Sequence, residues 1–183
     1  MYMQKTVVLL MILVGILAHG QSVYATKSGQ LSFAASQPTF EPIAAQHTAV
    51  SALLKTETGE LAILALVRGF RFKLALMEEH FNENYIESHR YPKTHFTGTL
   101  ANVDWETLDQ GPQTVTITGK LQLHGITKPL STNATLAQQD NGLLLTAAFS
   151  VQASDYKIAI PKLVRKQIAE EVQIEVKLPL QTR

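Results

Sequence analysis

Residues 69–98, GFRFKLALMEEHFNENYIESHRYPKTHFTG, decide the fold. The stretch opens with alternating apolar and polar residues, and this pattern places Phe70, Phe72 and Leu74 on one face of a strand. Residues 76–88 then carry apolar side chains at four-residue spacing, which predicts a short amphipathic helix. A second alternating strand follows. We therefore expect a β-sheet protein with one helix inserted between two strands as a lid.

The rest of the chain also alternates, with turn residues between the segments. Residues 115–123, VTITGKLQL, are the most regular of about eight such segments. One apolar and one polar face on each strand is typical of an antiparallel sheet with a dry interior. We predict an all-β, eight-stranded antiparallel barrel, with a second short helix at residues 161–169 before the last strand.

A β-sandwich is the competing architecture. The barrel is favoured because several residues on the inward faces are small, and small residues leave space inside. These residues are Ala35, Gly98, Gly119, Thr132, Ala134 and Ala147.

Composition limits the remaining possibilities. The chain has 183 residues, a net charge of +1 and no cysteine, so we expect one domain over residues 21–183. The absence of cysteine excludes disulfides, thiolate chemistry and a lipid anchor on cysteine. No basic run alternates with aromatic residues, so we expect no nucleic-acid partner.

The N-terminus has the pattern of a secretory signal peptide. Lys5 precedes an apolar run over residues 7–17, and small residues follow it. We expect residues 1–20 to be removed by cleavage after Gly20. Cleavage after Ala25 is the alternative, although that position already looks like part of the opening strand. The mature protein is therefore expected to be periplasmic or secreted.

Four segments in order carry a resemblance to a known family: LMEEHFNENYIES, YPKTHFTG, TGKLQLHGITKPL and FSVQASDYKIAIPKLV. They resemble the YceI-like family of polyisoprenoid-binding periplasmic proteins, in the form common among Bacteroidetes. The resemblance covers nearly the whole mature chain. It implies a lipocalin-like barrel that holds a long isoprenoid in an apolar tunnel. No head-group contact is carried over from the family.

We interpret the protein as a non-catalytic lipid-binding protein that sequesters or carries a long-chain isoprenoid of the quinone or polyprenol type. It is expected to need no cofactor and to contact membranes transiently. The apolar run at residues 61–67 fits either a core strand or the interface of a homodimer. The residues predicted to contact the ligand are Phe70, Phe72, Leu74, Met77, Phe81, Tyr85, Phe96, Leu121, Phe149 and Tyr156.

Two competing functions are weaker. One is an accessory or stress-response protein, or a partner of a membrane cytochrome, whose barrel is filled by its own side chains. The other is a metal-dependent enzyme that uses one face of the lid helix, where His80, Glu83, Asn84 and Glu87 recur at helical spacing. This spacing lacks a second histidine, so a solvated helix face is the better interpretation.

Two polar positions have open interpretations. His124, at a strand end, is expected to hydrogen-bond to the backbone of a turn. Tyr156 closes one end of the tunnel while Asp155 or Lys157 holds the polar end of a ligand, or Asp155 starts a turn and pairs with Lys157.

Overall fold

The structure is a computed structural model that describes residues 22–36 and 42–183. The predicted signal peptide, residues 1–20, lies outside the described residues. Ala25 lies inside the first strand, where it pairs with Leu53 and Gln181. Within the described residues, no helix is long and apolar enough to cross a membrane.

Within the described residues, nine strands form one antiparallel sheet. Their bounds are β1 Val23–Ser36, β2 Ala44–Lys55, β3 Glu60–Leu66, β4 Arg71–Phe72, β5 Lys93–Ala101, β6 Gln113–Leu123, β7 Ile126–Gln139, β8 Gly142–Gln152 and β9 Ile168–Thr182. The helical elements are short: α1 Ala75–His80, the π-helical turn η2 Phe81–Tyr85, and the 3-10 turns η1 Val67–Gly69, η3 Leu108–Gln110, η4 Ala153–Tyr156 and η5 Lys162–Val164.

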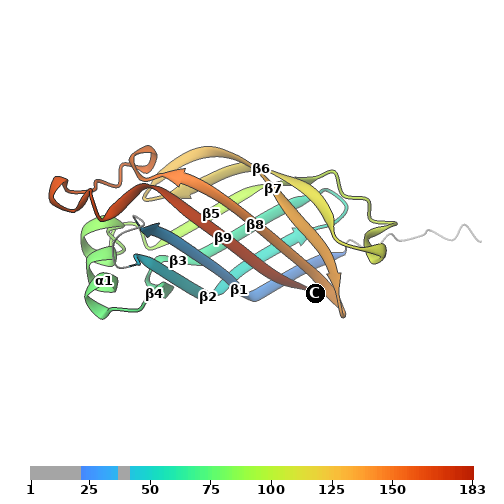
Figure 1. The fold of residues 1–183 in the computed structure, drawn as a ribbon. Coiled ribbons are helices and arrows are strands. Elements are labelled where there is room, and N and C mark those ends of the chain that lie inside the picture. The colour runs from blue at the N-terminus through green and yellow to red at the C-terminus, as the bar shows by residue number, and fades with distance from the viewer. Residues whose placement is uncertain (1–21, 37–41) are drawn as a thin grey trace, which may run out of the picture.

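The sheet closes into a barrel of eight long strands in the order β1-β9-β8-β7-β6-β5-β3-β2, because β2 pairs with β1 (Figure 1). The ninth strand, β4, adds only two residues beside the end of β2. Closure confirms the predicted eight-stranded barrel and excludes the β-sandwich, since a sandwich keeps two separate sheets.

The strand β1 bends at Gly29, where its pairing with β2 shifts register on both sides. A side chain at this position would meet the Val50 carbonyl oxygen at 2.9 Å and a methyl group of Leu178 at 2.6 Å. A glycine bulge of this kind increases strand curvature, which a small barrel needs in order to close.

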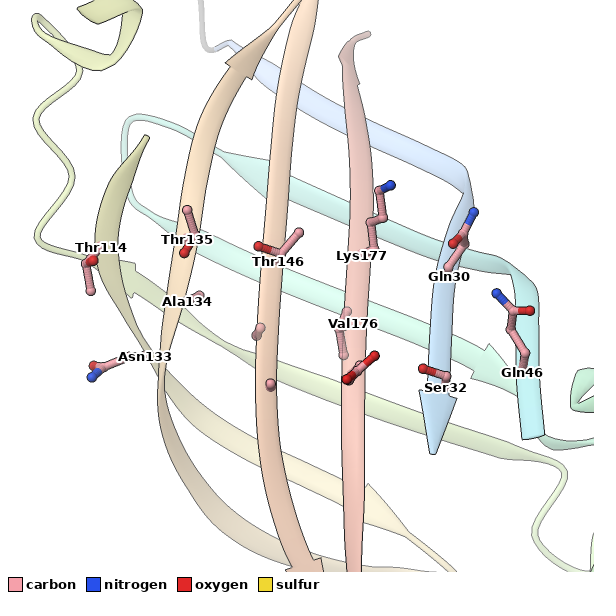
Figure 2. Close-up of a pocket in the computed structure, with 13 residues that line it drawn as sticks. Gln30, Ser32, Gln46, Thr114, Asn133, Ala134, Thr135, Thr146, Val176 and Lys177 are labelled. Atoms are coloured by element: carbon pink, nitrogen blue, oxygen red, sulfur yellow. The ribbon is translucent and has the colours of Figure 1, made fainter. Parts of the chain in front are cut away.

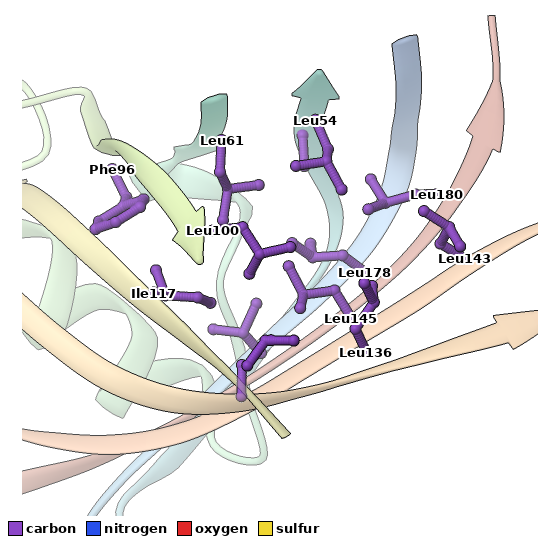
Figure 3. Close-up of a cluster of buried hydrophobic side chains, with 14 of the residues drawn as sticks. Leu54, Leu61, Phe96, Leu100, Ile117, Leu136, Leu143, Leu145, Leu178 and Leu180 are labelled. Carbon is purple, nitrogen blue, oxygen red and sulfur yellow. The ribbon is translucent and has the colours of Figure 1, made fainter. Parts of the chain in front are cut away.

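A leucine-rich core fills the end of the barrel away from α1. Figure 3 shows side chains from β2, β3, β5, β6, β7, β8 and β9 that converge there, and eight of the core side chains have less than 2% of their surface exposed. The largest of these are Leu54, Leu61, Leu136, Leu145, Leu178 and Leu180. This half of the barrel is a packed interior.

Two of the small inward residues do not leave open space. Gly98 and Gly119 face each other across β5 and β6. The ring of Phe96 covers both, with its Cζ atom 2.6 Å from where a Cβ atom would lie at either position. The glycines do provide space, as predicted, but the neighbouring ring of Phe96 occupies it.

The inserted segment between β3 and β5 differs in detail from the prediction. A helical segment is present, and α1 and η2 together span residues 75–85. The strand before it is shorter than predicted, and Leu74 is already the cap residue of α1. Gly69 lies in the turn η1, against the ring of His47, where a side chain would overlap the imidazole.

His47 explains why that turn is tight. Its side chain is buried, Nδ1 accepts a hydrogen bond from the backbone N–H of Ala49 at 3.0 Å, and its ring meets Phe70 edge-on. Burial lowers the pKa of His47, so the ring packs as a neutral group.

The predicted helix at residues 161–169 was wrong. Only the turn Lys162–Val164 is helical, and β9 begins at Ile168, where it pairs with Ser36. Proline at position 161 favours a helical start, but pairing with β1 draws the chain into the sheet within a few residues.

The packed end is expected to carry much of the stability. Leu136→Ala should lower the free energy of unfolding by about 2–5 kcal/mol, because the site is fully buried in β7. Leu163→Ala, at a position that is 94% exposed, should change it by less than about 0.5 kcal/mol. Urea unfolding measures both. Equal effects of the two substitutions would contradict the packed core.

Candidate functional site

A cavity of about 310 Å³ lies at the end of the barrel that α1 covers. Its walls are the inward faces of β1, β6, β8 and β9, and its cover is formed by α1, η2 and η5. This volume is at the lower end of the range for small-molecule sites.

Four phenylalanines pack together between the lid and the barrel wall. Phe33 comes from β1, Phe70 and Phe72 from the segment before α1, and Phe81 from η2. Their ring centroids lie 5.1–5.8 Å apart, in tilted or edge-to-face arrangements. Aromatic pairs prefer this geometry, so the cluster fixes the lid on the strands while it presents an apolar surface to the cavity.

Successive inward side chains of one strand line different parts of the interior, as β9 shows. Val172 and Ile174 line the cavity. Val176 and Leu178 line a smaller, wholly apolar chamber of about 60 Å³ beneath it. Leu180, the next inward residue, belongs to the leucine core. The cavity therefore has a closed inner end.

A ring of four side chains separates the cavity from the inner chamber, because these residues line both. They are Leu31, Thr94, Leu121 and Phe149, and we call them the neck. Phe96 lines the inner chamber below the neck. An apolar chain that enters from the α1 end would pass the neck before it reached the core.

The cavity is lined mainly by apolar side chains, and most of its polar groups lie near the mouth. Its lining contains no Asp, Glu, Lys or Arg side chain. The Thr94 hydroxyl, at the neck, donates a hydrogen bond to the Gln122 carbonyl oxygen at 2.7 Å. Burial raises the pKa of Tyr85, so its phenol stays neutral. The side chains of His80 and Gln167 are exposed at the rim.

One histidine joins the lid to the barrel. The side chain of His124, at the end of β6, is 9% exposed. Its Nδ1 atom lies 2.9 Å from the carbonyl oxygen of Tyr156, and its Nε2 atom lies 2.9 Å from a carboxylate oxygen of Glu87, just after η2. A carbonyl oxygen and a carboxylate oxygen both accept hydrogen bonds, so a ring with a proton on each nitrogen satisfies both contacts at once.

Glu87 is held from two sides. Its other carboxylate oxygen accepts a hydrogen bond from Arg90 at 2.7 Å. The bonds from Arg90 and His124 lower the pKa of Glu87. Glu87 and His124 both have positive φ angles, of 47° and 50°, which are uncommon for residues other than glycine. We call the group of Glu87, Arg90 and His124 the latch.

The structure brings most of the predicted ligand contacts together. Seven of them line the cavity: Phe70, Phe72, Met77, Phe81, Tyr85, Leu121 and Phe149. Phe96 lines the inner chamber instead. Leu74 lines neither space and is 44% exposed. Tyr156, the last residue of η4, is buried, does not line the cavity, and contributes its carbonyl oxygen to the contact with His124.

Sequence reasoning missed the contributions of β1 and β9. Phe33 belongs to the aromatic cluster, and Val172 and Ile174 form one wall of the cavity. The alternation of these strands marked the residues as inward. Nothing in that pattern showed that they lie at the lid end of the barrel.

The other polar predictions have clear outcomes. His124 does bond to a backbone carbonyl, as predicted. The carboxylate of Asp155 pairs with the Nζ atom of Lys128 at 3.4 Å, so the predicted pairing with Lys157 was wrong. Lys157 instead caps the end of η4 in a left-handed conformation. Within residues 22–36 and 42–183, no group of three or more His, Asp or Glu side chains is placed to hold a metal ion.

A larger hollow of about 590 Å³ lies on the outer wall of the barrel and is more polar (Figure 2). Short polar side chains such as Thr135 and Thr146, together with Lys177, line it. They alternate with the core-facing residues Ala134 and Val176. This hollow has no aromatic surface, and the apolar cavity is the better candidate for a binding site.

The latch makes stability depend on pH. The lowered pKa of Glu87 means that the unfolded chain binds a proton more readily, so its contribution is present above about pH 4.5 and is lost as the pH falls through the lowered pKa. Glu87→Gln should flatten the dependence of stability on pH in this acidic range. Thermal unfolding from about pH 7 to about pH 3 measures the difference. An unchanged profile would contradict the ion pair.

Removal of His124 should lower the free energy of unfolding at neutral pH more than the Glu87→Gln substitution does. His124→Ala leaves the carbonyl of Tyr156 without its partner, and we expect a loss of about 1–3 kcal/mol in the free energy of unfolding. His89→Ala is the matched control, since His89 is an exposed histidine near the same turn. Comparable losses from the two substitutions would contradict the role of the latch.

Comparison with known proteins agrees with this architecture. A structure described as a polyisoprenoid binding domain from Saccharophagus degradans, implicated in plant cell wall breakdown, has a TM-score of 0.74 at 15% identity, over 89% of this chain and 99% of that one. BcnA of Burkholderia cenocepacia has a TM-score of 0.69 at 16% identity, over 84% and 96% of the two chains. A YceI protein of Campylobacter jejuni has a TM-score of 0.58 at 13% identity, over 73% and 81%.

These likenesses concern the fold, because the identities are low. Comparison with curated protein sequences gives no match. The family model described as the YceI-like domain, however, matches residues 23–180, from the start of β1 almost to the end of β9. On this evidence the chain belongs to the YceI-like family.

Proposed function

We propose that this protein binds the apolar chain of an isoprenoid lipid in the cavity beneath α1, and carries or sequesters that lipid outside the cytoplasm without catalysis. The observation that carries the proposal is an apolar cavity with one covered mouth and a closed inner end. The description of a structurally similar domain as polyisoprenoid binding supports the same ligand class.

The size of the cavity bears on how much of the lipid is held. At roughly 30 Å³ per heavy atom, the share of a water molecule in the liquid, about 310 Å³ admits about ten carbon atoms. This corresponds to about two isoprene units. Any further length must either extend out of the mouth or spread the neck toward the inner chamber.

Burial alone can hold such a chain. Ten carbons at about 0.8 kcal/mol each give about 8 kcal/mol of favourable transfer free energy. Loss of translational and rotational freedom offsets part of this. A chain that fills only half of the cavity would therefore bind weakly, and useful affinity needs the whole depth down to the neck.

The lining also favours one orientation. The polar groups lie near the mouth, where His80, Gln167 and the hydroxyl of Tyr85 can bond to a head group. The deeper wall offers no free donor, since the Thr94 hydroxyl already donates to a backbone carbonyl. A lipid would enter tail first and keep a quinone ring or a hydroxyl group at the rim.

The proposed location rests on the sequence of residues 1–20, which has the pattern of a signal peptide. A periplasmic or secreted protein is the natural carrier of a lipid that water does not dissolve. Mass measurement of the mature protein from cells would show cleavage after Gly20 or contradict it.

The experiment for ligand binding is a chain-length series. Affinity for geraniol, farnesol and a long polyprenol should rise until the chain fills the cavity, then level off, as measured by displacement of a fluorescent fatty-acid probe. Solvent extraction of the purified protein followed by mass spectrometry tests for a co-purified lipid. No displacement by any member, together with no extracted lipid, would overturn the proposal.

A paired substitution on β9 localises the binding. Ile174→Trp places a large ring in the cavity and should weaken binding at least about tenfold, since it displaces the equivalent of about two methylene groups. Gln173→Trp places the same ring on the outer face of the same strand and should leave binding unchanged. Equal affinities of the two variants would place the ligand elsewhere.

A further inference from the structure

The loop before β9 presents an apolar tip beside the cavity mouth. Residues 161–167, which we call the mouth loop, contain η5. Leu163 is 94% exposed, more than any other large hydrophobic residue in the described chain. Its neighbours Val164 and Gln167 line the cavity. One short loop thus faces the cavity on one side and solvent on the other.

The mouth loop is also basic. Lys162, Arg165 and Lys166 are exposed on either side of Leu163, and the loop contains no acidic residue. None of the three takes part in an ion pair in the described structure; Arg165 donates a hydrogen bond to the carbonyl oxygen of Ile160 at 3.2 Å. The whole chain has a net charge of only +1, so this loop is a local concentration of positive charge.

Exposed leucines also lie across the mouth from the loop. Leu74 and Leu76, at the start of α1, are 44% and 61% exposed. Their element lines the cavity through Met77, and Figure 1 shows α1 and the loop before β9 at the same end of the barrel. The α1 side also exposes Glu79 and Glu83. Positive charge is therefore concentrated on the mouth loop, and α1 adds apolar surface.

We propose that the mouth loop docks the protein on a bilayer of anionic phospholipid, with Leu163 inserted among the lipids and the three cations among the head groups. The inference rests on the proposed function, because a ligand insoluble in water has to pass between a bilayer and the cavity. Apolar side chains flanked by lysine and arginine bind anionic membrane surfaces in this way.

A bilayer fits these features better than a protein partner does. A protein interface of standard size needs a patch of several hundred Å² on each partner, whereas a single protruding leucine surrounded by cations offers little flat area. Insertion of that leucine also places the cavity mouth against the membrane, so a lipid need not cross water.

Vesicle sedimentation tests the docking directly. The protein should bind vesicles of mixed phosphatidylglycerol and phosphatidylcholine. Its binding to vesicles of phosphatidylcholine alone should be at least about tenfold weaker, and high salt should weaken its binding to the mixed vesicles by a similar factor. Leu163→Ser and the double variant Lys162→Gln with Lys166→Gln should each weaken the binding severalfold. Trp105→Ser is the matched control, since Trp105 is a 39% exposed hydrophobic residue in the segment between β5 and β6, at the other end of the barrel.

A transfer assay separates this proposal from the proposed function. Leu163→Ser should take up farnesol from dilute ethanol as the wild type does, but should acquire it more slowly from anionic vesicles. Normal uptake together with equal vesicle binding by all variants, or equal binding to charged and neutral vesicles, would overturn the docking proposal alone. Failure of uptake from ethanol in the wild type would instead overturn the cavity as the binding site.

Discussion

Pairing of β1 with β2 is the constraint on which the rest of the structure depends. The two strands pair from Val23 opposite Lys55 to Ala34 opposite Ala44, and this ladder turns a sheet with two free edges into a barrel. Without it, the inward face of β1 would meet solvent and both edges would expose unpaired backbone groups. The bend at Gly29 lets β1 contact β2 and β9 at once. Closure places every inward side chain in one enclosed interior.

Once the barrel is closed, position along a strand becomes depth in the interior. The core-end residues are mostly leucine and exclude everything else, whereas the lid-end residues surround a cavity. The barrel is filled by its own side chains at the core end and is hollow at the lid end. A half-filled barrel gains stability from its packed core and keeps a cavity at the other end.

The lid end combines rigid and accessible parts. The phenylalanine cluster and the latch fix the segment between β4 and β5 on the strands, with His124 reaching both Glu87 and the backbone of Tyr156. The mouth loop on the other side has fewer such contacts and carries the exposed Leu163.

The sequence by itself determined the strands, their inward faces and the apolar stripe of the lid, because these follow from periods of two and of about four residues along the chain. Met77, Phe81 and Tyr85 do line one cavity, as their spacing predicted. Only the tertiary structure decided which inward residues meet. Phe33 joins Phe70 across a long stretch of chain, and Phe96 occupies the space beside Gly98. Periodicity tells which way a side chain points, but its depth and its neighbours depend on strand register and barrel closure, and these arise from pairing between distant segments.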